Sequence, residues 1–297
     1  MKHIGIIGLG DMGIGLSRNI IKAGFCLTGF DVREERLKLL EEAGGTRGES
    51  VADVGANSDA VIVMVLNGRQ AIEVVSGDEG LRNSMKPGST IIVSATIEPA
   101  EVRQVEQALE GSGIELIDTP VSGGKSGAEN GTLTMMAAAK REVFDAQHDV
   151  LKAVGKDIFY VGETIGIGQT VKASLQALIG STFTAIFEAL VLGSKAGVPG
   201  KVLYEVFTSS GVRSPLLEGC AKLIMDREFK DTGSHIGTMY KDLGITMNLA
   251  KQNGVAMFTT SSSYELFQSG ISLFPDEDNW SIVKLLEQIA GTEVTWD

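Results

Sequence analysis

Cysteine is scarce in this chain of 297 residues, and basic residues are fewer than acidic ones. The two cysteines, Cys26 and Cys220, lie far apart, so the sequence contains no disulfide framework and no zinc-ligand pattern. Lys and Arg number 26 against 38 Asp and Glu, which gives a net charge of −12. This balance argues against a nucleic-acid partner and against an anionic membrane surface, although it is compatible with a local anion site.

Histidine clusters and hydrolase motifs are also missing. The three histidines, His3, His148 and His235, show no short metal-ligand spacing, and we expect no metal site. No G-x-S-x-G element is present to support a hydrolase. We therefore interpret the three histidines as structural or surface residues.

The sequence also lacks a long run free of polar residues. The longest apolar stretch, residues 175–198, contains Gln176, Glu188 and Lys195, so we expect a buried helix rather than a membrane span. A strand-like segment begins within the first residues and leaves no room for a signal peptide. Together with the cysteine content, this favours a cytoplasmic protein.

What is present is an alternation of short apolar runs and amphipathic stretches over about the first 160 residues, which is typical of βα units around a parallel sheet. The expected strands are 4–7, 26–30, 60–66, 90–94 and 114–117, and the expected helices are 14–23, 33–43 and 98–109. After Gly162 the strands stop, and helix-length segments follow at 167–196, 199–209 and 236–253. We expect an α/β domain over 1–163 and an all-helical domain over 164–297.

The segment Gly8-Leu9-Gly10-Asp11-Met12-Gly13 is a G-x-G-x-x-G motif that follows a strand and opens a helix, the context in which this motif binds dinucleotides. Gly8 permits the tight turn, Gly10 lets a pyrophosphate approach the backbone, and Gly13 allows close packing of helix on strand. The amino end of the helix supplies N–H groups to the phosphates. The motif indicates a doubly wound, Rossmann-type sheet.

Asp31 ends the second expected strand, where a carboxylate accepts hydrogen bonds from the adenosine ribose. Its charge would repel a 2′-phosphate, which favours NAD over NADP. Arg33 lies two residues further on and could bind that phosphate instead.

Two more segments lie at the carboxyl edge of the expected sheet, where ligands of open α/β folds bind. Leu66 and Asn67 end one strand, and Thr96 follows another. Thr96 could contact a ligand or could cap the helix that begins near Glu98.

A glycine-rich segment, residues 119–128, follows the strand that ends near Asp118. Its Gly124-Lys125-Ser126 triplet resembles part of a P-loop, but that motif needs glycine at the position that Thr119 occupies. Ser122, Gly123 and Gly124 then form either a nest of N–H groups for a carboxylate or a flexible turn.

The segment Gly166–Lys172 opens the long helical region and places Lys172 in its first turns, with Gln176 one turn later on the same face. Lys172 could be a surface lysine whose stem lies along the helix end. A buried lysine, by contrast, suits proton transfer to and from an alcohol.

These residues resemble the β-hydroxyacid dehydrogenases, a family that includes 3-hydroxyisobutyrate dehydrogenase and tartronate semialdehyde reductase. The resemblance covers essentially the whole chain and follows four features in order: 8–13, 118–134, 166–172 and the Lys241-Asp242-Leu243-Gly244 segment. It implies a Rossmann-type domain, an all-helical domain, an active site in the cleft between them, and dimers or tetramers.

The resemblance also implies roles for single residues. Ser122, Gly123 and Gly124 would hold the substrate carboxylate, Lys172 would be the catalytic acid/base, and Lys241 would close over the cofactor. Cofactor contacts are further implied for Thr96, Leu66 and Asn67, although Asn67 replaces the proline usual in the family.

The positions after Lys172 depart from the family. Leu175 and Gln176 stand where two asparagines are common, and Gln176, as a substrate-binding amide on a longer arm, resembles the branch acting on four-carbon sugar acids such as threonate. Leu175 differs from the histidine of that branch.

The sequence therefore predicts NAD-dependent oxidation of a small β-hydroxy acid, with Lys172 taking the hydroxyl proton. An NADPH-dependent semialdehyde reductase and a catalytically silent dinucleotide-binding module are the alternatives. Lys172 argues against the silent module, and against imine reductases, which usually replace this lysine.

Overall fold

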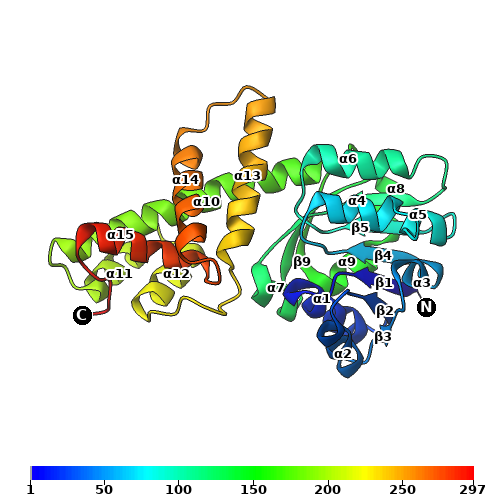
Figure 1. Ribbon diagram of the computed structural model, residues 1–297, viewed down its shortest axis with the longest axis horizontal. Coiled ribbons are helices and arrows are strands. Elements are labelled where there is room, and N and C mark those ends of the chain that lie inside the picture. The colour runs from blue at the N-terminus through cyan, green and yellow to red at the C-terminus, as the bar shows by residue number, and fades with distance from the viewer. Residues whose placement is uncertain (1) are drawn as a thin grey trace. The chain divides into compact units, whose positions relative to one another are not determined.

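The computed structural model describes residues 2–297 and separates into two compact units (Figure 1). The first unit ends at Lys172, and the second comprises Ala173–Asp297. The division falls inside helix α10 (Ile167–Lys195). The domain boundary expected from the sequence, between residues 163 and 164, lies ahead of this helix and stays a prediction.

The first unit is built on a nine-stranded sheet with the order β3-β2-β1-β4-β5-β6-β8-β7, in which β9 also pairs with β8. Strands β1 to β6 are parallel, and β8 runs antiparallel to β6 and β7. The strands are β1 His3–Ile7, β2 Cys26–Phe30, β3 Thr46–Arg47, β4 Ala60–Val63, β5 Thr90–Val93, β6 Glu115–Asp118, β7 Val121–Ser122, β8 Leu133–Ala138 and β9 Gly155–Gly162. The five strands expected from the sequence are confirmed, although β4 stops at Val63 rather than at residue 66.

Helices cover both faces of this sheet (Figure 1). They are α1 Asp11–Lys22, α2 Glu34–Glu42, α3 Val51–Ala56, α4 Gly68–Ser76, α5 Leu81–Ser84, α6 Pro99–Ala108, α7 Gly124–Asn130, α8 Arg141–Ala146 and α9 His148–Val154. Successive strand residues alternate between two apolar cores: Ile62 packs with α1, α2 and α7 to α9, whereas Val61 and Val63 pack with α3 to α6. The Rossmann-type, doubly wound architecture is therefore confirmed.

The second unit is helical. It contains most of α10, then α11 Gly200–Ser209, α12 Pro215–Met225, α13 Ile236–Gln252, α14 Phe258–Leu273, a short 3₁₀ turn at Asn279–Ser281 and α15 Ile282–Ala290. Its core gathers Phe187 and Leu190 of α10 with Leu243 and Phe267. Phe183 packs edge-on against Trp280, which fixes α10 on the 3₁₀ turn. The expected all-helical character of this region is confirmed.

Helix α10 is less buried than the sequence suggested. Ile186, Phe187 and Leu190 lie in the core, but Leu178 and Leu192 are 66% and 72% exposed. By length and composition alone α10 could cross a membrane, and 44% of the 18-residue window that meets this test is buried in the fold. The expectation of a buried helix therefore holds for the side of α10 that faces the core, while another side carries exposed leucines.

Candidate active site

The loop between β1 and α1 has the geometry that the glycine motif predicts. Gly8 has a positive φ of 94°, and a Cβ atom there would lie 2.3 Å from the carbonyl oxygen of Met64. A Cβ atom on Gly13 would lie 2.0 Å from the carbonyl oxygen of Gly8, so glycine is required at both positions. At Gly10 the nearest atom would be 3.8 Å away, on Arg33. Gly10 thus leaves room at the amino end of α1, where a pyrophosphate binds in this fold.

Asp31 follows β2 and contacts this loop. One of its carboxylate oxygens accepts a 2.7 Å hydrogen bond from the Leu9 N–H. The other accepts bonds from the Arg33 backbone N–H at 3.0 Å and from its Nε at 3.1 Å. Burial raises the pKa of Asp31, but the hydrogen bonds from Arg33 and Leu9 outweigh it and hold that pKa below its ordinary value. Asp31 is therefore a carboxylate fixed at the edge of the dinucleotide loop.

The segment after β4 is arranged by Asn67. Its side chain caps helix α4 by accepting a 2.9 Å hydrogen bond from the Gln70 N–H. Leu66, one residue earlier, is 74% exposed, and its N–H donates to the Gln70 side chain. Asn67 thus has a local structural role, and the expected cofactor contact of this segment stays a prediction.

Thr96 does not cap the helix after it. Helix α6 begins at Pro99 with Glu98 as the capping residue, and the Glu98 N–H donates a 2.7 Å hydrogen bond to the Glu101 carboxylate. The capping alternative for Thr96 is therefore wrong. Thr96 itself is partly buried, between Ala95 and Ile97.

The Ser122-Gly123-Gly124 segment lies between β7 and the short helix α7. Ser122 is half-buried and pairs in register with Thr134 of β8. Gly123 and Gly124 are exposed and have positive φ angles of 132° and 59°. The backbone is held on both sides of the glycines. Ser122 pairs with β8 before them, and the Gly127 N–H donates to the Gly123 carbonyl oxygen at 3.0 Å after them. The segment is thus an ordered turn with both glycines on the surface.

Sequence reasoning missed a buried carboxylate at the start of α10. Asp118 ends β6 and is fully buried. It accepts a 2.9 Å hydrogen bond from the Gly166 N–H and another of 2.9 Å from the Gln169 side-chain amide. Burial raises the pKa of Asp118 to about 6, although these hydrogen bonds oppose the rise. A strand-end aspartate followed by glycine-rich sequence was the only available signal, and it pointed to the Ser122 loop instead.

Lys172 lies on α10, one turn after Gly168, and is only 6% exposed. The interpretation of Lys172 as a surface lysine is therefore wrong. A Cβ atom on Gly168 would lie 2.5 Å from the Met136 carbonyl oxygen, so the helix start packs directly against the sheet. This close packing fixes the helix that carries Lys172.

In the second unit, Gln176 and Lys241 both contact Asp242. The Gln176 amide nitrogen donates a 2.6 Å hydrogen bond to one Asp242 oxygen, and the Lys241 ammonium lies 3.0 Å from the other. Gln176 and Asp242 are 5% and 3% exposed. The amide that the sequence assigned to a substrate hydroxyl therefore already has a protein partner.

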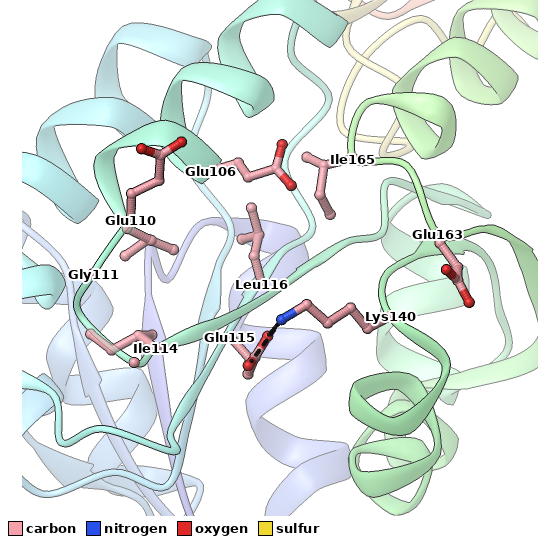
Figure 2. A pocket seen from close by; sticks show the side chains of 11 residues that line it. Glu106, Glu110, Gly111, Ile114, Glu115, Leu116, Lys140, Glu163 and Ile165 are labelled. Carbon is pink, nitrogen blue, oxygen red and sulfur yellow. Dashed lines mark hydrogen bonds and ion pairs between the residues drawn. The ribbon is translucent and has the colours of Figure 1, made fainter.

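One surface pocket of the first unit lies apart from these residues. It is lined by Glu106, Glu110, Glu115, Lys140 and Glu163, and Figure 2 shows Lys140 reaching Glu115, 3.0 Å away. Glu115 begins β6, whereas the Gly8 loop follows the carboxyl end of the parallel strand β1. None of the cofactor-binding, substrate-binding or catalytic residues predicted from the sequence lines this pocket.

Cysteines and histidines form no further site among residues 2–297. Cys26 is exposed and Cys220 is buried, and neither forms a disulfide. His3 contacts the Thr28 hydroxyl at 2.8 Å, and His235 caps α13 by accepting from the Gly237 N–H at 3.0 Å. No group of three metal-ligating side chains occurs in this described part. The structural interpretation of His3 and His235 is consistent with these contacts.

The doubly wound sheet, the glycine loop and the strand-end carboxylate together define a dinucleotide-binding protein. Two family models of NAD-binding domains match the chain and agree with this class of protein. Residues 3–162 match the NAD-binding domain of 6-phosphogluconate dehydrogenase, and residues 166–286 match the NAD-binding domain of NADP-dependent 3-hydroxyisobutyrate dehydrogenase.

Individual relatives of similar sequence and structure identify the family more narrowly. The chain is 32% identical to an L-threonate dehydrogenase of Escherichia coli K12 over 97% of this chain and 95% of the relative. It is 33% identical to 2-(hydroxymethyl)glutarate dehydrogenase of Eubacterium barkeri, over 98% and 97%. A 3-hydroxyisobutyrate dehydrogenase structure from Salmonella typhimurium superposes with a TM-score of 0.87 at 31% identity, covering 96% of this chain and 100% of that one.

The chain belongs to the 3-hydroxyisobutyrate dehydrogenase-like family of β-hydroxyacid dehydrogenases. It is an NAD(P)-dependent enzyme that acts on CH–OH groups. An imine reductase variant from Myxococcus stipitatus superposes with a TM-score of 0.65 at 16% identity, which shows a similar fold.

Proposed function

We propose that this enzyme oxidises a small β-hydroxy acid with NAD and uses Lys172 as the general acid/base. The observation that carries the proposal is the burial of Lys172 on a helix whose amino end is anchored, through Asp118, to the unit that holds the glycine loop. A lysine at such a site can take the hydroxyl proton as the C–H bond breaks. The bound nicotinamide supplies the hydride acceptor.

Two further roles follow for the chain's own residues. The Ser122-Gly123-Gly124 turn presents exposed glycines and the half-buried Ser122, which suits a substrate carboxylate. The Lys172 ammonium, once formed, would stabilise negative charge on the substrate oxygen. Thr96, Leu66 and Asn67 would contact the cofactor, and Lys241 would close over it.

Asp31 supports NAD as the cofactor, because a fixed carboxylate accepts hydrogen bonds from ribose hydroxyls and repels a 2′-phosphate. Arg33 is the observation that favours the second candidate, an NADPH-dependent semialdehyde reductase. Its guanidinium already lies against Asp31 and could turn toward a 2′-phosphate.

For the substrate, we propose a four-carbon polyhydroxylated acid such as threonate in preference to 3-hydroxyisobutyrate. Five L-threonate dehydrogenases are 31% or 32% identical to this chain. Gln176, which departs from the asparagine common in the wider family, would accept a hydrogen bond from a substrate hydroxyl at its amide oxygen, since its amide nitrogen donates to Asp242. A Mycobacterium tuberculosis 3-hydroxyisobutyrate dehydrogenase, 26% identical, has a structure described with L-serine, which is itself a β-hydroxy acid.

A turnover screen tests the proposal. The purified enzyme is assayed with C3 to C5 hydroxy acids, threonate and 3-hydroxyisobutyrate included, and with NAD and NADP. We expect the largest kcat/KM for a C4 sugar acid with NAD. Faster turnover of 3-hydroxyisobutyrate contradicts the substrate proposal, a preference for NADP contradicts the cofactor proposal, and no turnover of any hydroxy acid contradicts both.

A further inference from the structure

The side-chain amide of Gln169 is buried and uses every hydrogen-bonding group that it has. Its oxygen accepts a 3.1 Å hydrogen bond from the Ile97 N–H. Its nitrogen donates one hydrogen to the Ala95 carbonyl oxygen at 3.1 Å and the other to Asp118 at 2.9 Å. Gln169 is 1% exposed. Because an unpaired buried amide group costs about 1–3 kcal/mol, this complete set of partners fixes the side chain in one orientation.

Two of these partners flank Thr96. Gln169 bonds the carbonyl oxygen of the residue before Thr96 and the N–H of the residue after it, as a neighbouring strand would. The backbone of Thr96 is thereby held from both sides. Gln169 lies three residues before Lys172 on the same helix, which is just under one turn. A single side chain therefore links the position of Thr96 to the position of Lys172.

Asp118 is the third hydrogen-bond partner of the Gln169 amide. In addition to the Gln169 amide, it accepts a hydrogen bond from the Gly166 N–H at the start of α10. The following residue, Thr119, pairs its N–H with the Val93 carbonyl oxygen at the end of β5. The ends of β5 and β6 and the start of α10 are thus joined by buried hydrogen bonds rather than by apolar contact alone.

We propose that Gln169, held by Asp118, is a positioning residue that sets the Thr96 segment relative to Lys172. The inference rests on the proposed role of Lys172. A capped helix would need only the Asp118 bonds to the helix start, whereas the two bonds around Thr96 have no part in capping. Displacements of about 1 Å can lower turnover by about 100-fold, so a link of this kind bears on catalysis.

The main variant is Gln169→Leu, which keeps the approximate size and removes all three bonds. We expect kcat to fall by about 10-fold or more and NADH binding to weaken several-fold, because the Thr96 segment loses its fixed position. Hydrogen exchange at the Ile97 N–H should become faster, and this measurement needs neither substrate nor cofactor.

Gln147→Leu is the matched control. Gln147 is also a buried amide of the first unit and donates a 3.0 Å hydrogen bond to the Thr90 hydroxyl at the opposite end of β5. Its loss should lower the thermal midpoint while leaving kcat and NADH binding within about twofold of wild type. Equal kinetic losses in the two variants overturn the proposal, and so do unchanged kcat and NADH binding in Gln169→Leu.

The pH dependence of kcat in Gln169→Glu distinguishes a positioning role from a purely structural one. Its carboxylate loses the donors toward Ala95 and Asp118, but protonation restores one of them. We expect its kcat relative to wild type to recover more strongly as pH falls than that of Gln169→Leu, in which Asp118 is the titrating group at this position. A pH-independent ratio for both variants contradicts positioning through this amide.

A double-mutant cycle separates this inference from the proposed function. In a Lys172→Ala background, Gln169→Leu should have a much smaller effect on kcat, because the group that it positions is gone. Equal effects in both backgrounds overturn positioning of Lys172. A Lys172→Ala enzyme with full turnover instead contradicts the proposed acid/base, whatever Gln169 does to NADH binding.

Discussion

The Gln176 amide nitrogen donates a 2.6 Å hydrogen bond to Asp242, which ties helix α10 to helix α13 within the second unit. Both side chains are buried, so the bond is shielded from water. Gln176→Leu should leave one oxygen of a buried carboxylate without its donor and should lower the free energy of unfolding by about 1–3 kcal/mol. Urea unfolding measures this change. A loss below about 0.5 kcal/mol would show that water or another donor replaces the amide.

Lys172→Ala should reduce kcat by at least about 100-fold, the scale typical of general acid/base catalysis. NAD binding should change little, because Lys172 is assigned to the substrate hydroxyl rather than to the dinucleotide. Steady-state kinetics with a working substrate, together with NADH titration, provide the measurement. Equal turnover in variant and wild type would end the assignment.

Cofactor choice should depend on Asp31 and Arg33 in opposite directions. Asp31→Asn removes the charge that repels a 2′-phosphate and should narrow the gap in kcat/KM between NAD and NADP. Arg33→Ala removes the guanidinium beside that carboxylate and should widen the gap. A wild-type preference for NADP, or a shift of the same sign in both variants, argues against this account.

The pH dependence of stability should reveal Asp118. Burial raises its pKa from 3.8 to about 6 in the folded protein, so the folded state binds this proton more tightly than the unfolded state. The resulting stabilisation is complete below about pH 4 and is lost as pH rises through about 6. Its full size is about 3 kcal/mol.

Asp118→Asn should abolish this dependence. As pH falls from 7 to 5, the free energy of unfolding of wild type should rise relative to that of the variant, whichever protein is more stable at pH 7. Urea titrations at several pH values measure it, with Gln147→Leu as a control of similar burial. A difference that stays constant with pH would show that Asp118 does not titrate in this range.

Self-association is expected through the second unit. Leu178 and Leu192 of α10 and Val206 of α11 are each more than half exposed, and an apolar groove between these helices includes Ile186 and Phe207. Helices with apolar residues on several sides are usually buried on several sides, and we propose a homodimer or homotetramer of this chain. Light scattering that finds only 31.4 kDa monomers at micromolar concentration would contradict it. Leu192→Glu should lower the measured mass if α10 lies in the interface.

The parts of the fold and site that follow local patterns were predictable from the sequence. The glycine motif placed the dinucleotide loop and Asp31, since both follow from spacing after a strand. Strands β3 and β7 were not predicted because two residues are too few to show a period, and the longer strands β8 and β9 were not predicted either. The expected strand over 60–66 was too long because the chain leaves the sheet after Val63 and exposes Leu66.

The contacts that position the site could not be predicted in this way. Gln169 meets Asp118 from 51 positions away and Ile97 from 72, and Gln176 meets Asp242 from 66. No periodicity relates residues so distant, and an isolated glutamine gives no sign that its amide will be buried. Sequence spacing identifies residues that contact a ligand more readily than it identifies the buried residues that position them.

The shared helix α10 also limits how this chain can be divided. A fragment that stops at residue 163 would lack Gly166 and Gln169, and so would leave Asp118 buried without its donors. A fragment that begins at 164 would carry Lys172 without the strands that orient it. Circular permutation or exchange of halves between relatives would therefore preserve these contacts only if the new joint lies outside the first turns of this helix. The compact unit that ends at Lys172 keeps all of these contacts, whereas a domain that ends at residue 163 loses them.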